Sequence, residues 1–200
     1  MNPARRAVRL LVLGWLACDV PFEQLRHDDR AAYVKEGYGG RPIECFPPFG
    51  FYRLFAAGRS EEAVDSFRSW YREQFRKYAR VPKRLGGMQD GSLYRLVASE
   101  CVAEGVPFRA DEPALSDSPL ERAIELRVSQ RLELFASIRD RGFLSSASTP
   151  ILGIRRPGEI RLTGGHHRAA ALRVLGYATF PSVSVFQPSL HRALKALRIV

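Results

Sequence analysis

The sequence predicts an α/β or α+β fold, with a core of short mixed strands and helices and a large helical insertion. An alanine-rich helical segment, residues 169–175, lies between two stretches of alternating apolar residues, 160–162 and 183–185. Long amphipathic helical patterns occupy residues 60–79 and 118–142. The chain has 200 residues, of which 46% are hydrophobic, and this is enough for a real core.

Residues 8–17 form an apolar run that we expect to be a buried strand or the start of a helix. Basic residues precede the run, so a cleaved or anchoring segment is the alternative, although the run is short and the residues before Cys18 make a poor lipobox. No stretch approaches the roughly 20 apolar residues of a membrane span, so we expect no transmembrane segment. Three cysteines without C-x-x-C spacing indicate neither a disulfide framework nor a zinc site, and we expect a reduced, cytoplasmic setting.

Residues 37–50 are rich in glycine, proline and aromatic side chains, and we expect a loop that is neither regular helix nor central strand. The aromatic residues of this region have two interpretations: they stack a base or sugar, or they pin an irregular loop to the core. They are Tyr38, Phe46, Phe49, Phe51 and Tyr52.

Residues 60–79 are predicted to form a helix that Ser60 caps and whose first turns are acidic. Its second half and the residues after it are strongly basic, with arginine or lysine at 68, 72, 76, 77, 80, 83 and 84. Basic residues suit the negative end of a helix, and this is one interpretation. The other is a stripe that binds phosphates of nucleic acid or of a charged glycan or lipid. The net charge of +10 favours anionic partners but does not choose among them.

A second long helix is predicted from the capping box of Ser118 and Glu121 to Gly142, after a shorter helix over residues 92–105. A strand at Ile151 and a short C-terminal helix within residues 187–200 complete the pattern. We expect the core to comprise residues 1–36 and 118–200 and the helical insertion to comprise residues 37–117.

The clearest indication of a functional site is a strand-to-helix junction, where Gly164 and Gly165 precede His166, His167 and Arg168. Glycines allow a ligand to approach the backbone, and the amides and dipole of the following helix favour an anion. Arg168 adds a fork of donors that suits phosphate, and the histidines donate hydrogen bonds. The junction therefore predicts a phosphate site; the alternative is a tight connection with a solvated surface.

An ordered series of motifs over residues 134–185 resembles the ParB and sulfiredoxin superfamily. The series consists of Ser137-Ile138-Arg139 with Gly142, residues 150–154, Gly158, Gly165-His166-His167-Arg168, Leu175-Gly176 and residues 180–185. A segment similar to the superfamily's opening "VP…L" lies at residues 19–26. The resemblance implies a loop that holds nucleotide phosphates, and the Gly-His-His-Arg spelling is closest to the free-serine-kinase-like members.

Two departures limit what the resemblance carries over. His166 stands where sulfiredoxins have their reactive cysteine, so sulfinic acid repair is not expected. The residues after 187 are too few for the helix-turn-helix domain of partition proteins.

The resemblance implies a nucleotide-binding protein, either a phosphotransferase acting on a small-molecule acceptor or a nucleotide hydrolase. ATP, ADP or CTP with Mg²⁺ would bind at a set of residues that also includes two serines of the segment before residue 151. These are Thr163, Gly164, Gly165, His166, His167, Arg168, Ser145 and Ser146. Glu23 would act as base, with His166 and His167 as further catalytic candidates; an exposed glutamate in a first helical turn is the alternative for Glu23.

Two other functions stay open. The first is a non-catalytic nucleic-acid-binding or adaptor module that uses the basic residues 68–84. The second is a nucleotide fold that has lost its ligand and serves as an assembly part. No G-x-x-x-x-G-K-[ST] or G-x-S-x-G motif is present. No metal site is predicted, because adjacent histidines project differently and His27 and His191 are remote in sequence. The oligomeric state is left open.

Overall fold

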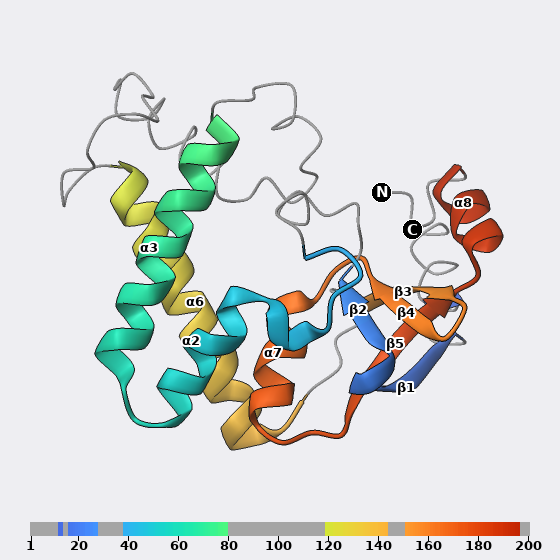
Figure 1. Ribbon diagram of the computed structural model, residues 1–200, viewed down its shortest axis with the longest axis horizontal. Coiled ribbons are helices and arrows are strands. Elements are labelled where there is room, and N and C mark those ends of the chain that lie inside the picture. The colour runs from blue at the N-terminus through green and yellow to red at the C-terminus, as the bar shows by residue number, and fades with distance from the viewer. Residues whose placement is uncertain (1–11, 14–15, 28–37, 80–118, 144–150, 197–200) are drawn as a thin grey trace. The chain divides into compact units, whose positions relative to one another are not determined.

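The computed structural model describes residues 12–13, 16–27, 38–79, 119–143 and 151–196. These residues form helices and a mixed five-stranded sheet, which confirms the predicted α/β or α+β class (Figure 1). The chain divides into two compact units, residues 1–52 with 137–200 and residues 53–136. The limits differ from the expected ones, because residues 38–52 belong with the sheet and residues 119–136 with the other unit.

The sheet has the strand order β1-β5-β3-β4-β2. Its strands are β1 (Ala17–Pro21), β2 (Leu25–His27), β3 (Ile151–Arg156), β4 (Glu159–Leu162) and β5 (Thr179–Phe186). The pairs β1–β5 and β3–β4 are antiparallel, whereas β3–β5 and β2–β4 are parallel. The predicted strands at Ile151, residues 160–162 and residues 183–185 are therefore confirmed.

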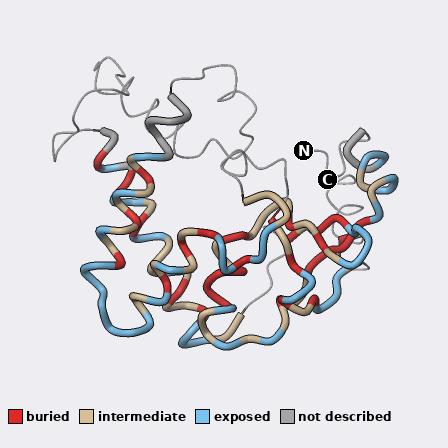
Figure 2. The backbone as a smooth tube through the Cα atoms, in the orientation of Figure 1, coloured by how far each residue is buried: buried red, intermediate tan, exposed pale blue. Residues whose placement is uncertain are grey.

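One face of the sheet packs tightly around Gly153. A Cβ atom there would lie 2.6 Å from Cγ2 of Ile160 and 3.2 Å from Cγ1 of Val183, so β3 has room only for glycine at this point. The opposite face carries Phe186 and Leu152, which pack with Leu13. The register of β3 against its two neighbours therefore places apolar side chains on both faces, and Figure 2 shows the resulting buried segments of the sheet.

Helix α7 (His166–Val174) follows β4 and ends as predicted, with Gly176 at a φ of 85°. Four consecutive residues, 169–172, are buried (Figure 2). Three of them are alanines, whose small side chains allow the helix backbone to approach its neighbours closely. A shorter helix, α8 (Pro188–Ala196), forms within the predicted C-terminal segment.

The region 37–50 is more helical than expected. A 3-10 turn, η3 (Ile43–Cys45), precedes helix α2 (Pro47–Ala56), so the prediction of an irregular loop was wrong for residues 43–50. The physical reason is that Pro47 and Pro48 occupy the first turn of α2, where the missing N–H has no intrahelical acceptor to lose. Residues 22–24 form a second 3-10 turn, η1 (Phe22–Gln24).

The second unit contains α3 (Ser60–Ala79) and most of α6 (Pro119–Arg141). Both helices confirm the predicted ranges, and Gly142, just after α6, adopts a φ of 74°. The predicted helix over residues 92–105 lies outside the described residues. Within the described part of the chain, no helix combines the length and apolar character needed to cross a membrane.

Candidate functional site

The predicted phosphate site comprises the three residues after β4 and the first three residues of α7. Together, residues 163–168 are called the β4–α7 loop here, and their backbone begins α7 in an unusual way. Gly165 is the N-cap residue, in the left-handed region at φ 81° and ψ 14°, and no side chain caps the helix. A Cβ atom at Gly165 would lie 3.2 and 3.3 Å from two side-chain atoms of Ile151, whereas one at Gly164 would meet no atom of the described residues within 4 Å. The loop is therefore pressed against the core at Gly165 and open at Gly164.

Thr163 anchors the start of the loop to β3. Its amide donates to the carbonyl of Leu152 at 3.0 Å, and its hydroxyl lies 3.3 Å from the same oxygen. The hydroxyl of Thr163 therefore donates its proton to the sheet. Toward any other partner, this oxygen can only accept a hydrogen bond.

The first turn of α7 is electrostatically positive. It contains no acidic residue, and it carries Arg168, whose side chain is half-buried. Any helix N-terminus exposes amide N–H groups that have no acceptor inside the helix, and the helix dipole adds about half a positive charge. The loop can therefore stabilise an anion through its backbone and through a guanidinium group.

His166 is buried in the core beside His27, a residue that the sequence did not predict to be part of the site. Its Nδ1 atom lies 2.9 Å from Nδ1 of His27, both side chains are buried, and the two rings stack with centroids 5.0 Å apart. Phe46 packs on both rings. His27 reaches this place because β2 runs parallel to β4, with His27 opposite Leu162. The alternation of Leu25 and His27 was the only local signal of an inward-facing histidine.

Burial keeps this histidine pair neutral. It lowers the pKa of His27 to about 4, against smaller opposing effects of the Ile43 backbone and the Glu44 carboxylate. It also lowers the pKa of His166 to about 3, and the neighbouring His27 adds to that shift. At neutral pH one ring carries a proton on Nδ1 and donates it in a hydrogen bond to Nδ1 of the other ring. His166 therefore supplies no positive charge to a phosphate, and its side chain acts inside the core.

His167 is half-buried and forms its hydrogen bond with a different residue. Its Nδ1 atom is 3.3 Å from the hydroxyl oxygen of Tyr52, and the rings of Phe46 and Tyr52 meet its ring edge-on. Phe46 and Tyr52 are themselves 1% and 0% exposed, so they pin this region to the core and do not present a face to a base.

The remaining predicted site residues lie apart from the loop or outside the described residues. Glu23 is exposed in η1, between β1 and β2, and no described contact joins it to residues 163–168. Ser145 and Ser146 fall in the segment 144–150, which is outside the described residues. The loop itself thus brings together Thr163 to Arg168, and the structure adds Tyr52 beside His167.

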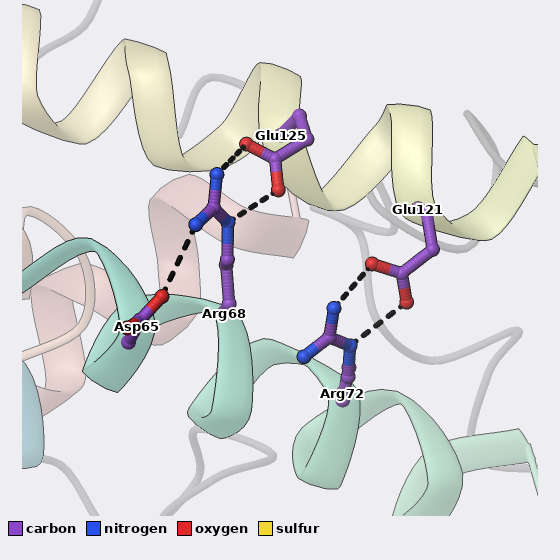
Figure 3. A network of polar contacts seen from close by, with 5 residues as sticks. All are labelled: Asp65, Arg68, Arg72, Glu121 and Glu125. Atoms are coloured by element: carbon purple, nitrogen blue, oxygen red, sulfur yellow. Dashed lines mark hydrogen bonds and ion pairs between the residues drawn. The ribbon is translucent and has the colours of Figure 1, made fainter. Parts of the chain in front are cut away.

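The basic helix α3 directs two of its arginines at carboxylates of α6 (Figure 3). Arg68 contacts Glu125 at 2.5 and 2.9 Å and Asp65 at 3.1 Å, and Arg72 contacts Glu121 at 2.8 and 2.5 Å. These ion pairs neutralise part of the predicted basic stripe and give Arg68 and Arg72 a structural role. The side chains of residues 74–84 lie outside the described part.

The described residues contain no group of three histidine, cysteine, aspartate or glutamate side chains that could hold a metal ion. Comparison of the chain with protein-family models, with curated proteins and with solved structures finds no significant match.

Proposed function

We propose that this protein binds the phosphate groups of a nucleoside di- or triphosphate at the β4–α7 loop. The observation that carries the proposal is the start of α7. Gly165 in the left-handed region begins a helix that has no side-chain cap, no acid in its first turn, and Arg168 within that turn. Among the described residues nothing fills the space at Gly164, and this supports access of an anion to the backbone amides.

A phosphate fits this arrangement better than a carboxylate does. Its oxygens accept several hydrogen bonds at once, from backbone amides and from the planar fork of a guanidinium group. Hydrogen bonds to charged groups contribute about 1.5–3 kcal/mol each, so two or three of them, about 3–9 kcal/mol, correspond to dissociation constants from just below micromolar to several millimolar. Binding experiments therefore need nucleotide up to millimolar concentration.

The nucleotide is ATP, ADP or CTP with Mg²⁺, as the resemblance of residues 134–185 to the ParB and sulfiredoxin superfamily implies. In its catalytic form the proposal adds a small-molecule acceptor. The acceptor hydroxyl would lose its proton to the Glu23 carboxylate while its oxygen forms a bond to the terminal phosphorus. The bond from that phosphorus to the bridging oxygen would break, and the nucleotide would leave with one phosphate fewer: a diphosphate from ATP or CTP, a monophosphate from ADP. The role of Glu23 as base is proposed only from the resemblance, because no described contact joins Glu23 to residues 163–168.

A cytoplasmic location belongs to the same proposal. Cys18 and Cys45 are free thiols with exposed side chains, which agrees with a reducing environment. The alternative of a nucleic-acid-binding or adaptor module gains no support from Arg68 and Arg72, whose guanidinium groups are held by carboxylates of the protein itself.

The proposal is tested by calorimetric titration with ATP, ADP and CTP, with and without Mg²⁺. Arg168→Ala is expected to weaken binding at least tenfold, since it removes a charged hydrogen-bond donor. Arg156→Ala is the matched control, because Arg156 is exposed and lies at the hairpin end of β3, opposite Glu159. The proposal fails if millimolar nucleotide does not bind, or if both variants bind as the unchanged protein does.

A further inference from the structure

We propose that His27 is a positioning residue of the phosphate site: its hydrogen bond to His166 fixes the first residue of α7, and uptake of a proton by the pair releases this turn. The proposal deepens the proposed function and rests on it for the ligand. It is carried by the contact between Nδ1 of His27 and Nδ1 of His166, which lie 2.9 Å apart and belong to residues 139 positions apart in the sequence.

His166 stands where an anchored side chain controls the backbone of the loop. It directly follows the N-cap residue Gly165, so its amide is one of those that have no acceptor inside the helix. The first backbone bond of the helix runs from the amide of Ala169 to the carbonyl of Gly165, at 2.9 Å. A ring that is held in the core fixes the Cα atom of His166 and thus the direction of the peptide groups on either side of it.

His27 is itself held by its backbone. It ends β2 and lies opposite Leu162 in the parallel pairing of β2 with β4. Its amide donates to the carbonyl of Arg41 at 3.0 Å, and its carbonyl accepts from the amide of Gly40 at 2.9 Å. The ring of Phe46 packs on His27 and on His166. His27 therefore links the sheet to the start of α7.

Only one proton fits between the two Nδ1 atoms. At 2.9 Å one nitrogen donates and the other accepts with its lone pair, whatever else the two rings contact. A charged histidine has an N–H group at both ring nitrogens and cannot accept. Protonation of the accepting ring therefore brings two N–H groups together and places a charge in a buried position. Both effects favour a state in which the rings separate.

The pH range of this opening follows from the pKa values of the pair. In the folded state burial lowers the pKa of His27 to about 4 and that of His166 to about 3. Rings that become exposed on opening return to a pKa near 6.5, so opening takes up protons below this pH. Each histidine then raises the equilibrium constant for opening by up to about tenfold for each unit by which the pH falls.

Two charged groups lie against His27 and act in opposite directions. The Glu44 carboxylate raises the pKa of His27, but less than burial lowers it, and this carboxylate also contacts Arg173 at 2.7 Å. Arg161 places Nη1 3.3 Å from the carbonyl oxygen of His27. The segments in contact with the pair carry further titratable or charged side chains, which are Arg26, Tyr38, Arg41, Cys45, Glu159, His167 and Arg168. A variant that changes only His27 keeps all of them and separates their effects from that of the pair.

The first measurement is the opening of α7 without ligand, by amide hydrogen exchange at pH 7.5 and 5.0, expressed as protection relative to the unfolded chain. We expect the protection of residues 169–172 to fall at least tenfold more than that of residues 183–186 in β5. In His27→Asn the side-chain oxygen accepts from neutral or charged His166, so we expect this excess to fall below threefold. Equal falls in the two segments of the unchanged protein, or the same excess in His27→Asn, would overturn the proposal.

The second measurement is ADP affinity at pH 7.5. His27→Leu removes the hydrogen bond and is expected to weaken binding at least tenfold, whereas His27→Asn keeps a bonding group and is expected to stay within threefold. His191→Leu is the matched control, because His191 packs on Phe186 on the opposite face of the sheet.

Two results of the ADP titrations would overturn the positioning role. The first is equal affinity in His27→Leu and His191→Leu. The second is an equal loss in His27→Leu and His27→Asn, which would show that packing of the ring holds the loop without the hydrogen bond. If the unchanged protein does not bind ADP, the proposed function fails, whereas hydrogen exchange still decides whether the histidine pair holds the start of α7.

Discussion

The pair of His27 and His166 is the residue-scale feature with the clearest consequence for stability. Both histidines take up a proton near pH 6.5 when unfolded, but their folded pKa values are about 4 and about 3 because of burial. Between these limits the unfolded state binds more protons, so the free energy of unfolding falls as the pH falls. Below pH 6.5, each histidine lowers the free energy of unfolding by up to about 1.4 kcal/mol for each unit by which the pH falls.

Urea unfolding at pH 7.5, 6.0 and 5.0 checks this prediction. Replacing both rings, His27→Phe with His166→Phe, preserves aromatic packing and removes the titrating groups, so the double variant should lose most of this pH dependence. An equally steep pH dependence in the double variant would assign the effect to other groups.

At the scale of elements, α3 and α6 are joined by two arginine–carboxylate pairs that differ mainly in burial. The Glu121 side chain is 5% exposed, whereas the Glu125 side chain is 47% exposed. Removing the partner of a buried charge costs several kcal/mol, whereas an exposed ion pair contributes about 0–1 kcal/mol. We therefore expect Arg72→Met to lower the free energy of unfolding by about 2 kcal/mol or more, and Arg68→Met by about 1 kcal/mol or less.

Chemical denaturation of the two variants measures this difference directly. Glu121→Leu added to Arg72→Met is expected to restore much of the lost stability, because two apolar residues replace the buried pair. Equal losses in Arg68→Met and Arg72→Met would show that burial of the carboxylate does not decide the energetics of this helix pair.

At the scale of the whole molecule, the division into two units predicts where ligand effects appear. The β4–α7 loop and all five strands belong to the unit formed by residues 1–52 and 137–200, whereas α3 belongs to residues 53–136. A ligand stabilises the parts that it contacts and slows their local opening. ADP is therefore expected to slow amide hydrogen exchange around residues 163–170 and to leave residues 61–73 unchanged. Mass spectrometry of peptic fragments reports both regions, and equal protection in both would contradict this localisation.

Local patterns in the sequence were sufficient for much of the fold. The helical spacing of α3 and α6, the alternation in β4 and the glycine after α7 each reflect interactions within a few residues, and the structure confirms them. The start of α2 was missed because Pro47 and Pro48 were interpreted as loop residues, although the first turn of a helix tolerates proline.

The sequence by itself determined the glycine junction of residues 164–165, the helix that follows it and the positive character of that helix's first turn, because these depend on neighbouring residues. Only the tertiary structure decided that the adjacent residues His166 and His167 form hydrogen bonds with different partners. Strand pairing places His27 beside His166, 139 residues away in the sequence. Packing places Tyr52 beside His167, 115 residues away in the sequence. A local sequence pattern cannot predict contacts between residues so far apart in the sequence, since such contacts arise from the burial of apolar surface by the whole fold.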